Sequence, residues 1–249
     1  MNSTILLSVI NAKYVHASPA PWCLAAGVKA YAPELYDRLL IRDFNGKQKQ
    51  EDMLRMILSE KPGILSFSCY LWNIKATLEL CREVKKASPE TLIILGGPEV
   101  SYCADKILLE NLCVDYVFSG EGEEGFPAFL QATVQAEGLL DPEAGRAIPG
   151  LWGRQGEGIY ENSPAILSGG VPSPLTAGYQ EAVKGRMAYF ETSRGCPYSC
   201  AFCLSGRCGM PRYFDLEAIR KNASVLNLRK QNEAKRRQLQ EQRRQERNA

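Results

Sequence analysis

The chain has 249 residues, enough for one or two domains with a sizeable core, and its net charge is only +2. Residues 229–249 hold eight Lys/Arg and three Glu (+5), which leaves 22 Lys/Arg and 25 Asp/Glu (−3) elsewhere. This mildly acidic body argues against a nucleic-acid-binding domain, and no apolar run approaches the roughly 18 residues of a membrane span. Nine cysteines without a secretory signal indicate a reducing compartment, so we expect a cytoplasmic protein without nucleic-acid or membrane partners.

Strand and helix patterns alternate over the first 140 residues. Short apolar segments predict strands at 4–10, 35–43, 63–68, 91–95 and 114–118. Helical patterns predict helices at 21–31, 50–60, 74–86, 104–110 and 124–137. Such alternation is typical of a parallel sheet covered on both faces. We therefore predict a flavodoxin-like (Rossmann-like) α/β fold with five parallel strands in the order 2-1-3-4-5.

The ligand crevice of such a fold lies at the carboxyl ends of strands one and three. Loops 11–20 and 69–73 follow those two strands. The loops after strands four and five contain Gly96-Gly97-Pro98-Glu99 and Ser119-Gly120-Glu121-Gly122-Glu123. Their glycines permit a positive φ or a close approach of the backbone to a ligand.

A Gly- and Pro-rich region at 138–185 separates these elements from the rest of the chain. Within it, residues 150–153 and 158–160 predict a small hairpin, and residues 168–178 are typical of a linker between domains. Residues 186–193 then predict another strand, since they are rich in aromatic and β-branched residues. A cysteine-rich loop follows this strand directly, where α/β barrels place their chemistry.

Cys196, Cys200 and Cys203 form a C-x3-C-x2-C run, with Phe202 immediately before the last cysteine. Three thiolates this close in sequence can bind three irons of a four-iron cluster and leave the fourth iron open. A zinc knuckle completed by Cys208 is one alternative, and ordinary thiols without a metal are another. Five further cysteines are scattered and are predicted to be small buried apolar residues: Cys23, Cys69, Cys81, Cys103 and Cys113.

The cysteine run with its preceding aromatic resembles the fingerprint of the radical S-adenosylmethionine (SAM) superfamily. The four loops resemble those of the cobalamin-binding domain that precedes the radical SAM core in one large subfamily, over about residues 4–220. This resemblance implies that Cys196, Cys200 and Cys203 are metal ligands of a [4Fe-4S] cluster, whose open iron binds SAM. It also implies reductive cleavage of SAM, an electron donor such as flavodoxin or ferredoxin, and methyl transfer through cobalt to an unknown substrate.

The resemblance further implies that cobalamin lies across the carboxyl edge of the sheet. There it would face seven cofactor-binding residues: Tyr14, Ser68, Tyr70, Gly96, Gly97, Gly120 and Glu121. His16 is the only histidine in the sequence. Residues 14–19, which surround it, lack the Asp and the Gly of the cobalt-binding motif Asp-x-His-x-x-Gly. We therefore expect base-off cobalamin without a protein imidazole.

Four regions follow from the resemblance. They are a cobalamin-binding domain at 1–140, a hairpin and linker at 141–185, the N-terminal fragment of a radical SAM core at 186–223, and a basic polar tail at 224–249, helical or disordered. Only 46 residues (249 − 203) follow Cys203, whereas a partial barrel needs on the order of 150. We therefore expect a family member truncated after its first barrel unit and catalytically incomplete.

Two other functions remain open from the sequence. The first is a non-catalytic cobalamin-binding module with a vestigial cluster loop. The second is a nucleotide- or flavin-binding α/β domain that carries a zinc knuckle. The metal content and the bound chromophore of the protein would distinguish these possibilities.

Overall fold

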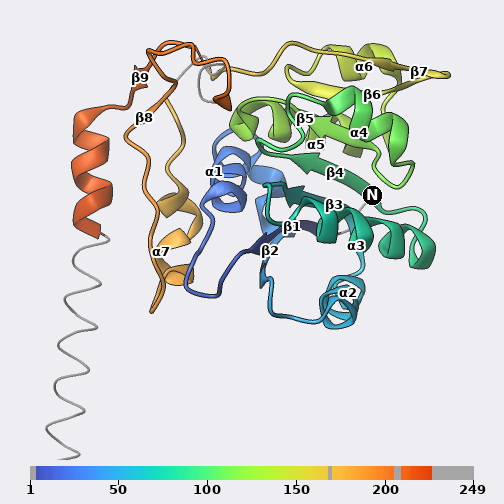
Figure 1. The fold of residues 1–249 in the computed structure, drawn as a ribbon, viewed down its shortest axis with the longest axis horizontal. Coiled ribbons are helices and arrows are strands. Elements are labelled where there is room, and N and C mark those ends of the chain that lie inside the picture. Colours follow the sequence, from blue (N-terminus) through green and yellow to red (C-terminus); the bar gives the residue numbers. More distant parts are fainter. Residues whose placement is uncertain (1–3, 168–169, 205–208, 226–249) are drawn as a thin grey trace, which may run out of the picture.

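The structure, a computed structural model, describes residues 4–167, 170–204 and 209–225. Its centre is a seven-stranded sheet in the order β2-β1-β3-β4-β5-β6-β7 (Figure 1). The parallel strands are β1 (Thr4–Asn11), β2 (Leu39–Asn45), β3 (Pro62–Ser68), β4 (Leu92–Gly96) and β5 (Tyr116–Phe118). The predicted α/β fold and its strand order 2-1-3-4-5 are confirmed, because the parallel pairs are β1–β2, β1–β3, β3–β4 and β4–β5.

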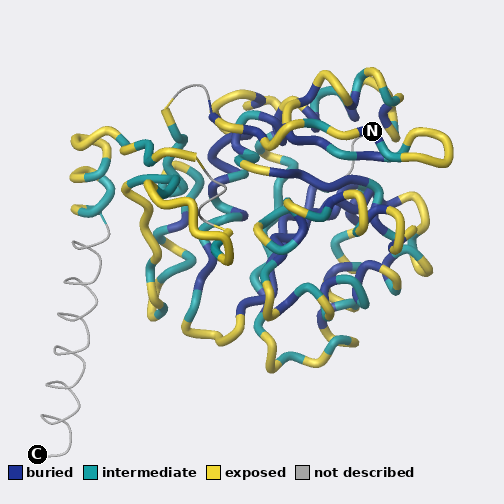
Figure 2. The backbone as a smooth tube through the Cα atoms, turned by 45° about the horizontal axis from the view of Figure 1, so that its top comes forward, coloured by how far each residue is buried: buried dark blue, intermediate teal, exposed yellow. Residues whose placement is uncertain are grey.

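Helices cover both faces of the sheet, as parallel strands that are apolar on both sides require. The helices are α1 (Ala20–Tyr31), α2 (Gln50–Ser59), α3 (Ile74–Ala87), α4 (Ala104–Glu110) and α5 (Gly122–Ala136). Helices α1 and α5 share one hydrophobic cluster, and α2, α3 and α4 share another on the opposite face. Figure 2 shows the buried strands between these two layers.

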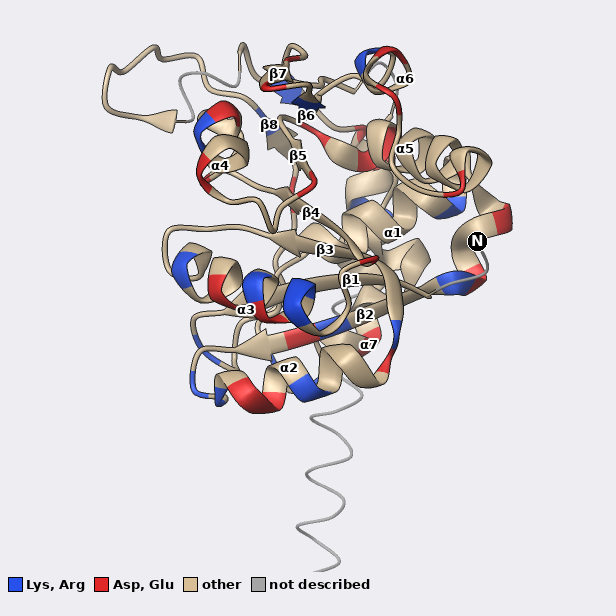
Figure 3. Ribbon diagram, turned by 90° about the vertical axis from the view of Figure 1, so that its right-hand side faces the viewer, with Lys and Arg blue, Asp and Glu red and all other residues tan. Residues whose placement is uncertain are grey.

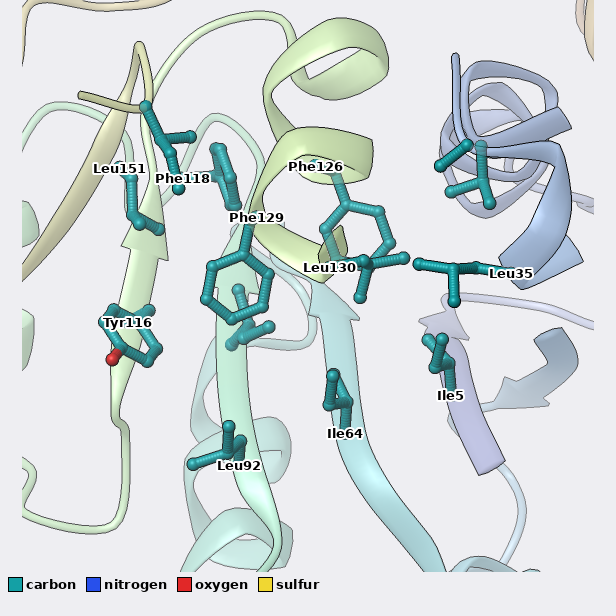
Figure 4. Close-up of a cluster of buried hydrophobic side chains, with 14 of the residues drawn as sticks. Ile5, Leu35, Ile64, Leu92, Tyr116, Phe118, Phe126, Phe129, Leu130 and Leu151 are labelled. Atoms are coloured by element: carbon teal, nitrogen blue, oxygen red, sulfur yellow. The ribbon is translucent and has the colours of Figure 1, made fainter. Parts of the chain in front are cut away.

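The core under α5 is largely aromatic. Phe126 and Phe129 of α5 pack against Phe118 of β5 with ring centroids 6.2 and 6.1 Å away (Figure 4). Tyr116 makes an edge-to-face contact with Phe129 at 5.1 Å. Burial of such rings stabilises a fold through large apolar areas and edge contacts. The start of α5 is therefore fixed firmly against the end of β5.

The opposite layer follows a helical period. On α3, Leu80, Cys81 and Val84 are buried, whereas Lys86 points to solvent and pairs with Glu83. Figure 3 shows that the charged residues of α2 and α3 lie on the outer sides of these helices. Both helices thus have the amphipathic pattern expected from the sequence.

Two details of the sheet differ from the sequence prediction. The strand expected at 35–43 starts later, because Pro33–Arg38 form a 3-10 helix (η1) that opens with proline at its first turn. The expected hairpin forms as β6 (Leu151–Gln155) and β7 (Gly158–Tyr160). It also extends the main sheet, since β6 pairs antiparallel with β5.

The rest of the described chain forms only short elements, some of them beside α1 (Figure 1). Its short elements are α6 (Pro142–Arg146), η2 (Pro174–Ala177), α7 (Tyr179–Ala182), β8 (Ser193–Arg194), β9 (Arg212–Tyr213) and helical residues 216–225. Linker residues 168–169 and the tail from 226 lie outside the described residues. Within the described part, no helix is long and apolar enough to cross a membrane.

The predicted strand at 186–193 is wrong. Met187 makes a single bridge to His16, and a ladder begins only at Ser193, where β8 pairs with β9. Hydrogen bonds from side chains, rather than pairing with a neighbouring strand, fix the position of this segment. The amide of Tyr189, for example, donates to the hydroxyl of Tyr179 at 2.9 Å. High β-propensity therefore produced an extended segment without a sheet.

Candidate functional site

A cavity of about 610 Å³ lies at the carboxyl edge of the sheet. The ends of β3, β4 and β5 contribute Ser68, Gly96 and Phe118 to its wall. Another side is closed by residues that flank the cysteine loop in sequence, namely Glu191, Ser193, Arg194, Gly195 and Arg212. This position is the crevice in which open α/β sheets bind ligands, and the volume suits a sizeable organic molecule.

Six of the seven predicted cofactor-binding residues line this cavity: Ser68, Tyr70, Gly96, Gly97, Gly120 and Glu121. Tyr14 does not line it. Its side chain is 69% exposed, and its ring lies 5.2 Å from the guanidinium carbon of Arg186. The carbonyl of Tyr14 accepts a hydrogen bond from the Arg186 side chain at 2.7 Å. Tyr14 thus helps to attach residue 186 to the loop after β1.

Tyr70 presents a hydroxyl group to the cavity region. Its hydroxyl lies 3.2 Å from Oγ of Ser18, and its ring stacks on Trp72 with centroids 4.6 Å apart. Trp72 is itself anchored, because its indole N–H donates to the carbonyl of Ile10 at 3.2 Å. Burial raises the pKa of Tyr70, so the hydroxyl stays protonated and able to donate a hydrogen bond.

The protein backbone itself requires glycine at two positions in the loops. Gly97 has φ +102°, and an added Cβ would stand 2.5 Å from the carbonyl oxygen of Cys69. Gly120 has φ +90°, and its Cβ would stand 2.3 Å from the carbonyl oxygen of Ala165. Neighbouring protein atoms therefore fill the space beside both glycines, where the sequence suggested a close approach to a ligand.

Glu121 is engaged by the protein rather than left free. One carboxylate oxygen accepts from the amide of Leu167 at 2.8 Å, and the other pairs with the guanidinium of Arg212. Next to it, Oε1 of Glu123 accepts from Nη2 of Arg194 at 2.6 Å. Sequence reasoning missed Glu123, Arg194 and Arg212. The paired glutamates of the loop were a visible signal, but their arginine partners lie 71 and 91 residues further along the chain.

Arg194 remains charged in this setting. Burial alone would lower the pKa of its guanidinium, but hydrogen bonds and charge from Glu123 and Glu191 raise it overall. The cation therefore persists at any pH at which the protein is folded, and it needs its carboxylate partners.

His16 is partly exposed and is absent from the lining of the cavity. Its Nδ1 forms a hydrogen bond with the hydroxyl of Tyr189, and the two ring centroids are 5.9 Å apart. Its carbonyl oxygen accepts from the guanidinium of Arg186. The imidazole is therefore held against residues 186–189.

In the C-x3-C-x2-C run, Cys200 is exposed, whereas Cys196 and Cys203 are half-buried. Among the residues that the structure describes, no three His, Cys, Asp or Glu side chains gather closely enough to hold a metal. The assignment of the run to an iron–sulfur cluster therefore stays a prediction. Cys208, the candidate fourth zinc ligand, lies outside the described residues.

The five scattered cysteines partly follow the prediction. Cys23, Cys69 and Cys81 are buried, as expected of small apolar residues, whereas Cys103 and Cys113 are only half-buried. Cys23 also lines the cavity.

Comparison with known proteins gives a consistent result. The family profile of the B12 binding domain matches residues 6–130, half of the chain. The chain is 33% identical over 171 residues to a 2-(S-pantetheinyl)-carbapenam-3-carboxylate methyltransferase of Streptantibioticus cattleyicolor, which covers 64% of this chain and 24% of that protein. It is 32% identical to the cobalamin-dependent radical SAM methyltransferase TokK of Streptomyces tokunonensis, and this match covers 60% of this chain and 23% of TokK.

A solved structure shows the same fold. The cobalamin-dependent SAM radical enzyme OxsB, with aqua-cobalamin and SAM bound, superposes with a TM-score of 0.68 at 16% identity. The superposition covers 90% of this chain and 32% of OxsB. The chain thus spans about a quarter to a third of the length of these similar proteins.

Proposed function

The chain belongs to the B12-binding domain family, and from this premise we propose that it binds cobalamin in the cavity at the carboxyl edge of its sheet. One observation carries this proposal: the cavity lies among the loops that contain six of the predicted contact residues. Cobalamin, when bound, supplies a cobalt centre able to carry a methyl group.

The residues of the cavity suit a large ligand with a polar edge. The hydroxyl of Tyr70 and Oγ of Ser68 offer hydrogen bonds, while Phe118 and Leu24 provide apolar surface that excludes water. Gly96 adds no side chain to the wall of the cavity. His16 lies outside the cavity, which supports binding without a protein imidazole.

We propose further that the chain is the cobalamin-binding part of a radical SAM methyltransferase. The names of similar proteins support this reaction class. Cys196, Cys200 and Cys203 are then the ligands of a [4Fe-4S] cluster, reduced by a donor such as flavodoxin or ferredoxin. Because the thiols do not converge here, ligation requires the loop to rearrange. The proposed divisions fall near residues 140, 185 and 223.

A second candidate function is a cobalamin-binding module without turnover. One observation favours it: among the described residues, the three thiols do not converge. In this case cobalamin would still occupy the cavity, but the cysteine loop would hold no cluster.

Anaerobic reconstitution with iron, sulfide and hydroxocobalamin, followed by metal analysis, tests both proposals. We expect about four irons and one cobalt per chain. Cys196→Ala, Cys200→Ala and Cys203→Ala should each lose iron and keep cobalt, whereas Cys113→Ala should keep both. Unchanged iron in all three variants would refute the ligand assignment. Cobalt without iron would indicate the binding module, and zinc alone would reject both.

A further inference from the structure

The short ribbon formed by β8 and β9 places two arginines side by side. In the antiparallel register, Arg194 of β8 lies directly opposite Arg212 of β9. Like charges directly opposite each other destabilise a two-stranded ribbon. The ribbon has only two residues in each strand. Its geometry therefore depends on negative charge supplied from elsewhere.

The start of α5 supplies that charge. Glu123 binds Arg194 at 2.6 Å, and Glu121 pairs with Arg212 while lying 3.8 Å from Nη1 of Arg194. A third carboxylate, Glu191, lies on the ribbon segment itself, 2.7 Å from Arg194. Two glutamates of the main domain thus hold both arginines of the ribbon.

The part of this network formed by Arg194, Glu121 and Glu123 is buried, whereas the side chains of Arg212 and Glu191 are 36% and 44% exposed. The side chains of Arg194, Glu121 and Glu123 are only 15%, 14% and 4% exposed. Arg220 and Glu217, in contrast, are 71% and 82% exposed. An exposed pair contributes little, but removal of one partner from a buried pair leaves a charge without compensation. The buried network therefore constrains the ribbon strongly.

The ribbon carries the cysteine loop. Cys196 continues the pairing, since its amide donates to the carbonyl of Gly209 at 2.9 Å. Gly195 has φ +102°, and an added Cβ there would stand 2.5 Å from the carbonyl oxygen of Met210. Gly195, Gly209 and Leu204 all line the cavity. The position of the ribbon thus determines where the cysteine loop lies over the cavity.

We propose that Arg194 and Glu123, assisted by Glu121 and Arg212, are positioning residues that dock the cysteine loop over the cavity. The docking brings the cysteine loop to the site of the ligand, so that a ligand in the cavity restrains the loop. The proposal of docking depends only on the observed ion pairs. The effect of a ligand on the loop rests in addition on the proposed cobalamin binding.

Hydrogen–deuterium exchange of the full chain, measured by mass spectrometry on peptides within 191–204, tests the docking. Without ligand, Arg194→Ala should speed exchange in these peptides by about tenfold or more, because the ribbon is released from α5. Arg194→Lys keeps the positive charge but loses the paired N–H donors of the guanidinium, so it should speed exchange less than Arg194→Ala does. Arg220→Ala is the matched control and should leave exchange unchanged.

A double-mutant cycle separates positioning from general loss of stability. If Glu123 acts through Arg194, Glu123→Gln should speed exchange alone but add little to Arg194→Ala. Additive effects, or unchanged exchange in both single variants, would overturn the proposal. Should Arg194→Ala fail to fold, Arg194→Lys and Arg212→Ala must still show faster exchange than the wild type, and normal exchange in both would also overturn the proposal.

Hydroxocobalamin tests the effect of the ligand. In the wild type it should slow exchange at 191–204, and in Arg194→Ala this slowing should be lost even at hydroxocobalamin concentrations that saturate the variant. Equal slowing in both proteins would reject the link to the ligand. Absence of hydroxocobalamin binding to the wild type would contradict the proposed function, whereas docking would still be decided by exchange without ligand.

Discussion

At the scale of single residues, burial divides the cysteines into two groups. Cys23, Cys69 and Cys81 are buried, and burial raises the pKa of each of these thiols. Cys200 is exposed. Since the thiolate is the reactive form, buried thiols of raised pKa are poor nucleophiles. The buried cysteines thus serve as apolar side chains of the core.

Alkylation of the native protein tests whether the exposed and the buried thiols differ in reactivity. With iodoacetamide at neutral pH, we expect Cys200 to be modified first, and Cys23, Cys69 and Cys81 to react only after denaturation. Peptide mass spectrometry gives the order of modification. Modification of Cys23 as fast as that of Cys200 would show that the cavity wall is more open than the structure indicates.

Gly97 should contribute to the stability of the fold as well as to the binding of a ligand. Gly97→Ala should lower the free energy of unfolding by about 1–3 kcal/mol, because the positive φ and the carbonyl of Cys69 both oppose a side chain. Gly138→Ala is the control, since Gly138 has open space around it and no positive φ. Urea denaturation compares the two variants, and equal stability would contradict this explanation.

The loop motifs predicted the location of most of the candidate residues, but not what these residues contact. Six of seven candidates line the cavity, because glycine-rich loops after parallel strands meet at one edge of the sheet. Tyr14 was misplaced, since its loop is attached to Arg186. The role of Glu121 could not be predicted, because Arg212 approaches it only through the path of the chain in space.

At the scale of elements, helices α1 and α5 pack unusually closely. An added Cβ at Gly27 of α1 would stand 2.1 Å from the carbonyl oxygen of Glu123, in the first turn of α5. Gly27 therefore lets α1 support the same turn that holds Arg194 through Glu123. Packing of this kind is a reason for glycine within a helix, where it is otherwise unfavourable.

Gly27→Ala should separate the two helices. We expect it to lower the free energy of unfolding by about 1–3 kcal/mol, as overpacking of a tight contact does. Ala30→Ser adds one atom at an exposed position of the same helix and should have little effect. Thermal unfolding followed by circular dichroism compares the variants. A melting temperature for Gly27→Ala equal to that of the wild type would contradict the close contact.

The elements themselves were largely predictable, and the exceptions have a common cause. Apolar strands such as Thr4–Asn11 and Pro62–Ser68 are buried on both faces, so their composition alone identifies them. Residues 186–193 have similar propensity, but the described chain places no neighbouring strand along most of them. Strand formation needs a partner, and local sequence does not contain that information.

At the scale of the whole molecule, the described chain is an α/β domain with a short ribbon held at its ligand edge. The strand order follows from alternating elements, so it could be predicted. The addition of β6 and β7 to the sheet could not, because it depends on the pairing of Trp152 with Val117 across 35 residues. The cavity likewise needs residues from beyond the domain, such as Glu191, Arg194 and Arg212, to close one side.

The central claim is that this cavity binds cobalamin, and a filled cavity would test it. Ser68 lies at the end of β3 in the cavity wall, so Ser68→Phe should place a ring where the ligand lies. Ser59→Phe makes the same chemical change at an exposed position at the end of α2, outside the cavity lining. The two variants form a matched pair.

The most direct measurement is equilibrium binding of hydroxocobalamin to the full chain, followed by visible absorption. We predict saturable binding of about one molecule per chain, weakened about tenfold or more by Ser68→Phe and unchanged by Ser59→Phe. Circular dichroism would establish that both variants are folded. Absence of saturable binding to the wild type, or the same affinity in both folded variants, would contradict the assignment of the cavity.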